Sequence, residues 1–166
     1  IYHFLPGIER IICTANTNEN NSFKLNQDTI LIILDSSNME RIGNISIDMS
    51  KIKFIINIDH HPSNTFFGKY NYVNHNVSSV GEIIYYLGIE MDCNITKEMA
   101  ICLYTAILTD TGSFRYSNTS TNTFRTSLKL VKKGINPSHI AGYIYNNNKL
   151  SSLKLLGEAL RGVQTD

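Results

Sequence analysis

The pattern of hydrophobic and polar positions contains two short apolar runs, and an aspartate follows each of them. The first covers Thr29 to Leu34 and is followed by Asp35, and the second covers Lys53 to Ile58 and is followed by Asp59. Runs of this length that are apolar on both faces are typical of central strands in a parallel sheet. Because parallel strands bring their carboxyl ends to the same edge, the pattern predicts that Asp35 and Asp59 share one rim.

Helical periodicity dominates the second half of the chain. Met99 and Leu103 recur at the spacing of one helix face, and Thr96 is placed to cap that helix. Similar signals predict helices that begin near Val80, Lys97, Thr121, Pro137 and Leu150. Two further short strands are predicted at Ile8 to Ala15 and at Tyr70 to Val73. Together these elements predict an α/β fold with a parallel sheet flanked by helices.

The composition of the chain restricts the functional classes that the protein could belong to, but it does not identify one of them. The 166 residues are 42% hydrophobic and 17% charged, which is typical of a globular protein. The net charge of +1 gives no overall basic field for long nucleic acid, although it is compatible with a small anionic substrate at a local site. Cys13, Cys93 and Cys102 show no metal-binding spacing, which favours reduced thiols in the cytoplasm. No apolar run is long enough to cross a bilayer, so we expect no membrane partner.

Three polar clusters carry the residues that are suited to chemistry. They are Asp35-Ser36-Ser37, Asp59-His60-His61 and Thr109-Asp110-Thr111-Gly112. Aspartate and histidine are ligands of divalent cations, and an aspartate shared by two such ions would form a hydrolytic two-metal site. Arg41 and Arg115 lie close to these clusters in the sequence, and a guanidinium group is suited to binding phosphate oxygens.

Each cluster also has a purely structural interpretation. Asp35 and Asp110 are of a residue type that caps turns and helices, and Asp59-His60-His61 precedes Pro62 as a surface turn would. Arg115 lies between two aromatic residues and could stack on them at the surface. We favour a site for Asp59-His60-His61, because three adjacent polar residues at the tip of a buried strand seldom serve packing alone. Both interpretations stay open for the two aspartates and for Arg115.

Four stretches of the chain resemble motifs of the DHH phosphoesterase superfamily. Asp59-His60-His61 resembles its signature, Leu34 to Ile42 resembles its second motif, and Ser78 to Tyr85 resembles the serine-led helix that follows the signature. Leu103 to Tyr116 resembles the fourth motif and is the most specific of these stretches. The similarity covers nearly the whole chain and points to the NrnA-like branch of oligoribonucleases and pAp phosphatases. It implies a DHH domain with a Rossmann-like, three-layer architecture.

The resemblance implies a metal centre and assigns a role to each of its residues. Asp35 would bridge two Mn²⁺ ions, and His60 and Asp110 would each complete the shell of one ion, with Mg²⁺ or Co²⁺ as alternative metals. Asp59 would hold His60 in one tautomer, as metal-bound histidines usually require. His61 would face the phosphate as a ligand or a proton donor. Asp59 and His61 are therefore the expected catalytic residues.

The resemblance also implies a reaction and its substrates. We expect a Mn²⁺-dependent phosphoesterase that hydrolyses short RNA or DNA oligonucleotides, 3′,5′-bisphosphonucleotides such as pAp, or both, with Arg115 and His61 in contact with the substrate. A cyclic-dinucleotide phosphodiesterase, a pyrophosphatase and an exopolyphosphatase would share the same metals and stay open. Two non-hydrolytic alternatives are a nucleotide-binding module with an incomplete metal site and, ranked last, a receiver-type domain phosphorylated on Asp35.

Two departures from the family pattern bear on domain organisation. The family's first motif supplies a histidine and two aspartates, and nothing between Ile1 and Asn26 matches it. The family's smaller C-terminal domain carries a Gly-Gly-His motif, which does not occur in this sequence. We therefore expect residues 1–148 to form a DHH domain without its first motif. We expect residues 149–166 to form a linker helix toward a substrate-binding domain outside this sequence, and we leave open a homodimer.

Overall fold

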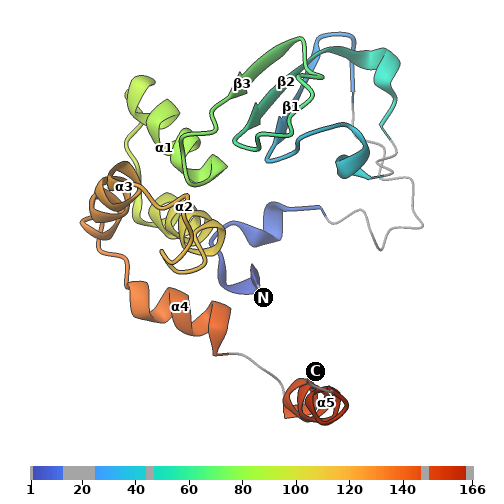
Figure 1. Cartoon of the computed structure of the whole chain (residues 1–166). Coiled ribbons are helices and arrows are strands. Elements are labelled where there is room, and N and C mark those ends of the chain that lie inside the picture. Colours follow the sequence, from blue (N-terminus) through green and yellow to red (C-terminus); the bar gives the residue numbers. More distant parts are fainter. Residues whose placement is uncertain (1, 13–24, 44–46, 147–149, 164–166) are drawn as a thin grey trace.

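Three parallel strands form the sheet in the described part of this protein. The computed structural model describes residues 2–12, 25–43, 47–146 and 150–163 (Figure 1). The strands are β1 (Thr29–Leu34), β2 (Ile52–Asp59) and β3 (Tyr70–Val73), and they lie in the order β1-β2-β3. Both neighbouring pairs are parallel. The predicted parallel sheet is confirmed.

The register of the sheet aligns the carboxyl ends of β1 and β2. Leu34 is paired with Ile58, and the backbone N–H of Asp35 donates to the carbonyl of Ile58 over 3.0 Å. Asp59 is the last residue of β2 and is paired with Val73 of β3. Asp35 follows β1, and Asp59 is the last residue of the neighbouring β2. Both therefore lie at one rim of the sheet, as the two apolar runs predict.

Strand β1 is less buried than its sequence suggests. Ile30, Ile32 and Leu34 are 47%, 57% and 48% exposed, whereas Ile33 is buried. The prediction of burial on both faces is therefore wrong for the described part of the chain. The physical reason is the position of β1 at the edge of the described sheet, whereas the nearest helix packs against the central strand β2.

The helices begin where short polar side chains cap them. Ser79, Thr96, Ser120 and Asn136 each accept a hydrogen bond from a backbone N–H in the first helical turn. The α-helices are α1 (Val80–Glu90), α2 (Lys97–Asp110), α3 (Thr121–Val131), α4 (Pro137–Tyr145) and α5 (Leu150–Arg161). Short 3₁₀ helices cover Tyr2–Phe4, Ile8–Arg10, Glu40–Ile42 and Met49–Lys51.

One predicted strand is absent from the described chain. Residues 8–10 of the expected Ile8 to Ala15 strand form a 3₁₀ helix, and residues 13–15 lie outside the described residues. Gly7, which precedes this helix, has a left-handed backbone with φ of 82°. The 3₁₀ helix leaves only residues 11 and 12 of the predicted strand as described non-helical chain, which is too short for a β-strand.

The main core lies among the helices, and a smaller core joins them to the sheet. Ala100, Ile107 and Leu130 are fully buried where α2 and α3 pack together. Ile58 of β2 packs with Val80 and Ile83 of α1 in the smaller cluster. Helices α1, α2 and α3 gather on one side of the sheet (Figure 1). The α/β class with a parallel sheet and packed helices is confirmed.

Helix α5 stands apart from the rest of the described chain (Figure 1). None of its described residues is buried, and its leucines are among the exposed apolar side chains. The predicted boundary between residues 148 and 149 lies outside the described residues, so the division into a domain and a linker helix stays a prediction. Among the helices described, none combines the length and apolar character that a membrane crossing requires.

Candidate metal centre

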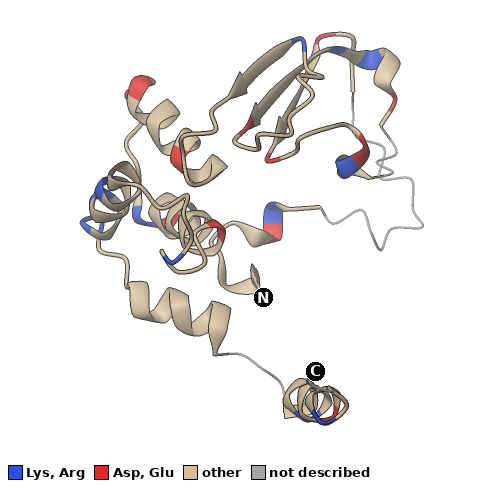
Figure 2. Cartoon of the chain, in the orientation of Figure 1, with Lys and Arg blue, Asp and Glu red and all other residues tan. Residues whose placement is uncertain are grey.

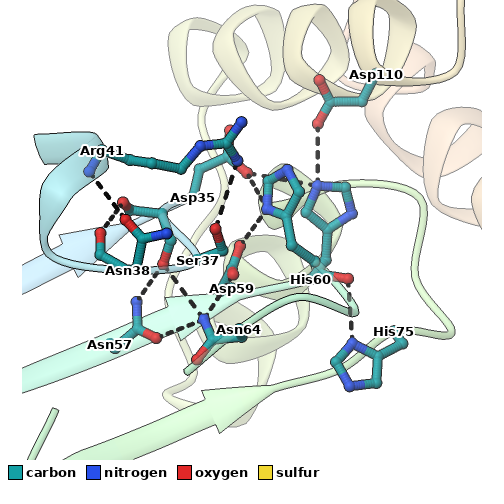
Figure 3. Close-up of polar contacts among 12 residues, drawn as sticks. Asp35, Ser37, Asn38, Arg41, Asn57, Asp59, His60, Asn64, His75 and Asp110 are labelled. Carbon is teal, nitrogen blue, oxygen red and sulfur yellow. Dashed lines mark hydrogen bonds and ion pairs between the residues drawn. The ribbon is translucent and has the colours of Figure 1, made fainter. Parts of the chain in front are cut away.

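The rim of the sheet brings one carboxylate and two imidazoles together (Figure 3). One potential ligand atom from each of Asp35, His60 and His61 lies within 4.8 Å of the others. Asp35 Oδ1 is 3.4 Å from His60 Nε2 and 3.7 Å from His61 Nδ1. The two imidazole rings are tilted, with centroids 4.6 Å apart. Residues that follow β1 and β2 thus form a compact group of oxygen and nitrogen donors.

Helix α2 brings a second carboxylate to this group. Asp110 is the last residue of α2, and its Oδ2 lies 3.9 Å from His60 Nε2. The helix ends in a turn at Gly112, whose φ of 53° confirms the expected left-handed conformation at this glycine. Asp35, His60 and Asp110, the three residues expected to bind metal, therefore meet between the sheet and the helices. Their role as ligands stays a prediction.

The backbone of Asp35 is unusual. Its φ of 58° lies in the left-handed region that few non-glycine residues occupy. Its carboxylate is half exposed, unlike the buried serine side chains of Ser36 and Ser37 that follow it. The sharp change of direction after β1 thus leaves Asp35 facing the two histidines. Strained backbone of this kind is concentrated at functional sites.

Asp59 contacts His61, and this differs from the expectation that it would hold His60. Its fully buried carboxylate lies 2.7 Å from His61 Nδ1 and accepts a 2.6 Å hydrogen bond from Asn64 Nδ2. The reason is strand geometry: residues i and i+2 of extended chain point to the same side, whereas residue i+1 points to the other. Asp59 and His61 therefore share one side of the chain, and His60 faces away from Asp59.

Asparagines complete the support beneath the rim. The Asn64 amide also donates to Asn57 Oδ1 over 2.8 Å, and Asn57 Nδ2 donates to the carbonyl of Ser36 over 3.1 Å. Both asparagines are buried. Sequence reasoning missed them, because a single amide side chain in a strand or loop carries no periodic signal. The network joins the chain after β1 to the chain after β2.

Contacts within the site and burial shift the pKa of four of its groups. The contact with Asp35, against the opposing effect of burial, raises the pKa of His60, and Asp110 and the backbone of Val77 add to the rise. The same contact with His60 lowers the pKa of Asp35. Burial, with the negative charge of Asp35, raises the pKa of Asp110. Burial also opposes ionisation of Asp59, but hydrogen bonds from Asn64 and His61 outweigh it and lower its pKa.

We expect the metal-free protein to show this coupling directly. The pKa of His60 should lie above its ordinary value of 6.5, and Asp35→Asn should lower it. Because the folded-state pKa is raised, protonated His60 stabilises the metal-free fold fully below the unfolded-state pKa. This contribution is lost as the pH rises through the folded-state pKa. Titration of ¹⁵N-labelled histidines by NMR measures the effect.

The control for this titration is Asp28→Asn. Asp28 lies at the opposite end of β1, where it is paired with Lys53. This variant should leave the titration of His60 unchanged. The coupling is refuted if His60 titrates at 6.5 or below in the metal-free protein and Asp35→Asn does not change its pKa.

The donor set suits a hard or borderline divalent cation. Asp35, His60, His61 and Asp110 offer carboxylate oxygens and imidazole nitrogens, which suit Mn²⁺ and Mg²⁺ better than soft metals. Acidic positions mark the tips of β1 and β2 (Figure 2). A cation would also relieve the repulsion that Asp35 exerts on Asp110. The side chains present thus fit a divalent metal.

Both arginines contact groups of their own segments of the chain. Arg115, the expected substrate contact, donates from Nε to the carbonyl of Gly112 over 2.6 Å, so part of its guanidinium is engaged by its own turn. Arg41 lies beside Asp35 and His61 along the hollow at the edge of β1, with Nη1 3.5 Å from Ser37 Oγ. The substrate role of Arg115 stays a prediction, and Arg41 is a second candidate.

Known proteins share this sequence pattern and fold. The family model described as "DHH family, N-terminal domain" matches residues 1–107. The bifunctional oligoribonuclease and PAP phosphatase NrnA of Thermus thermophilus is 31% identical over 144 residues, which cover 84% of this chain and 42% of that protein. The NrnA of Bacillus subtilis is 31% identical over 140 residues, which cover 82% of this chain and 44% of that protein.

A solved structure agrees with the sequence comparisons. The exopolyphosphatase-related protein from Bacteroides fragilis is 30% identical, has a TM-score of 0.72, and matches 82% of this chain and 41% of its own. The chain thus spans less than half the length of each of these relatives. The matching family model extends over the strands and both histidines of the rim. This chain, in which Asp59-His60-His61 forms the family signature, therefore belongs to the DHH family of phosphoesterases.

Proposed function

We propose that this chain is the metal-binding part of a Mn²⁺-dependent phosphoesterase acting on short oligonucleotides, 3′,5′-bisphosphonucleotides, or both. The observation that carries the proposal is the convergence of Asp35, His60, His61 and Asp110 between the sheet rim and the end of α2. The names of the Thermus and Bacillus relatives support the substrate class. The free thiols of Cys93 and Cys102 are compatible with the cytoplasm as its location.

The residues of the rim would divide the work of a two-metal hydrolysis. Asp35, His60 and Asp110 would hold the cations, with Asp35 central because it contacts both histidines. Bound divalent cations would supply an activated water and neutralise charge on the phosphoryl oxygens. Arg41 and Arg115 would bind the remaining phosphate oxygens through their guanidinium groups.

His61 would act on the substrate through one defined nitrogen. The ionised Asp59 carboxylate can only accept hydrogen bonds, so the His61 nitrogen that faces it, Nδ1, carries a proton. This leaves Nε2 to face the substrate, where in the doubly protonated ring it would donate to a phosphate oxygen and give up that proton to the departing oxygen. Asp59 thereby fixes both the tautomer and the orientation of the ring.

We expect Asp59→Asn to reduce phosphoesterase activity by about 10- to 100-fold, as the loss of a group that orients a site histidine usually does. The asparagine can accept from only one of the two donors that Asp59 serves, His61 and Asn64, and it presents an N–H₂ to the other. Steady-state rates at saturating Mn²⁺ measure the loss. Asp48→Asn alters only local contacts with Ser50 and Lys51 and should keep wild-type activity. Equal rates for Asp59→Asn and wild type would remove Asp59 from the site.

The proposed function is tested by product formation from a 5′-phosphorylated RNA dinucleotide and from pAp with Mn²⁺ present. The full-length gene product should hydrolyse at least one of them, and its Asp110→Ala variant should not. Cyclic dinucleotide, pyrophosphate and polyphosphate in parallel reactions distinguish the related hydrolases. A full-length protein that binds no Mn²⁺ and hydrolyses none of these substrates is a non-catalytic module, and the proposal is then wrong.

A further inference from the structure

The first turn of α1 carries a buried carboxyl group that is not among the proposed metal ligands. Glu82, in the first turn of α1, is fully buried. Its Oε2 accepts from the backbone N–H of Ser78 over 3.1 Å, from Ser78 Oγ over 2.7 Å and from Thr123 Oγ1 over 3.3 Å. Its Oε1 is buried without a hydrogen-bond partner among the described residues. Burying such a group is costly, so its retention calls for a role.

The contacts of Glu82 go beyond capping a helix. The cap of α1 is formed by Ser79, whose Oγ accepts from the backbone N–H of Glu82 over 3.3 Å. The Glu82 side chain instead holds both donors of Ser78, which precedes the cap and is fully buried. It also reaches Thr123 in the first turn of α3. Glu82 therefore connects the segment after β3 with the starts of α1 and α3.

Ser78 is also linked to residues on both sides of the metal centre. Its carbonyl accepts from Asn118 Nδ2 over 3.0 Å, and the same nitrogen donates to the carbonyl of Asp110 over 3.1 Å. On its other side, the backbone of the adjacent Val77 faces His60 closely enough to add to the rise in the pKa of that histidine. One buried serine thus lies between the residue that supports His60 and the residue that holds the end of α2.

We propose that Glu82 is a positioning residue for the metal centre, which acts through Ser78 and Asn118 to fix His60 relative to Asp110. This inference rests on the proposed function. The cations would need His60, which follows β2, and Asp110, which ends α2, at a constant separation. The group of Ser78, Glu82 and Asn118, termed the Ser78 clasp, supplies that constraint beside the site.

The test compares four variants of the full-length gene product by calorimetric titration with Mn²⁺ alone. Glu82→Ala and Asn118→Ala should each weaken Mn²⁺ binding by about 10- to 100-fold, the usual effect of losing an outer partner of a metal site. Ser79→Ala removes the cap of α1 and leaves the Ser78 clasp in place, so its affinity should stay close to that of the wild type. Glu82→Gln keeps an acceptor for Ser78 and should recover most of the affinity.

Asn118→Ala protects the test against misfolding. The Asn118 side chain is exposed, so its removal leaves the core intact. If Asn118→Ala and Glu82→Ala bind Mn²⁺ as tightly as wild type, or if Ser79→Ala weakens binding as much as they do, the positioning role is wrong.

A second readout does not depend on the metal. In ¹⁵N-histidine spectra of the metal-free protein, Glu82→Ala should shift the His60 signals and Ser79→Ala should not. If the wild type binds no Mn²⁺, the proposed function fails, and this spectrum still decides whether the Ser78 clasp positions His60. Unchanged His60 signals in Glu82→Ala would overturn the inference.

Discussion

Asp35→Asn is expected to abolish measurable phosphoesterase activity in the full-length gene product, with a loss of at least about 100-fold, the upper end of what removing an outer partner of a metal site costs. Within the described part of the chain, Asp35 is the acidic residue whose carboxylate lies within 4 Å of both His60 and His61. Asparagine keeps its size but replaces one anionic oxygen by an N–H₂ group, which cannot bind a cation. Activity and Mn²⁺ affinity should therefore fall together.

The matched control for this loss is Asp28→Asn, which changes the same residue type at the other end of β1. Asp28 forms an exposed ion pair with Lys53 over 2.8 Å. Exposed pairs of this kind contribute at most about 1 kcal/mol to stability, so the variant should be fully active. Assays with Mn²⁺ from micromolar to millimolar concentrations separate weak binding from a lost catalytic step. Asp35→Asn with wild-type activity would exclude Asp35 as a shared ligand.

Ile107→Ala is expected to lower the free energy of unfolding by about 2 to 5 kcal/mol, the range for removing a large aliphatic side chain from a core. Ile107 is fully buried in α2, where it packs in the same cluster as Tyr104 and Leu130. The truncation removes apolar contact and leaves a cavity that rigid helices cannot close. Urea denaturation followed by circular dichroism measures the change.

Leu128→Ala on α3 is the comparison for this stability effect. Leu128 is 56% exposed, so its truncation should change stability by no more than about 0.5 kcal/mol. The two variants lose aliphatic side chains of the same size from neighbouring helices. A similar unfolding midpoint for both would show that the α2–α3 core does not hold the fold together as the structure indicates.

The sequence predicts the strand tips well because two separate signals coincide there. The apolar runs locate β1 and β2, and an aspartate marks the end of each. Exposure of β1 could not be predicted in the same way, because hydrophobicity shows which side chains favour burial and not whether another element covers them. The starts of α1, α2 and α4 could be predicted from their capping residues, because a cap is a local interaction with the first turn of the helix.

The partner of Asp59 was within reach of sequence reasoning. The two-residue period of extended chain places Asp59 on the side of His61, and applying that period to the signature would have assigned the contact correctly. The support from Asn64 and from Val77 could not be found in this way. Both depend on how loops return to the rim, and loops carry no periodic pattern.

The left-handed backbone of Asp35 restricts which substitutions the position can accept. At a φ of 58°, aspartate, asparagine and glycine are the residue types that L-amino-acid sterics tolerate best. Glutamate would keep the negative charge but not this tolerance, and asparagine would keep the tolerance but not the charge. Asp110 ends an ordinary right-handed helix and is not limited in this way. Two separate requirements, a left-handed backbone and a negative charge, thus favour aspartate at position 35. At position 110 the backbone requirement does not apply, and only the negative charge favours aspartate.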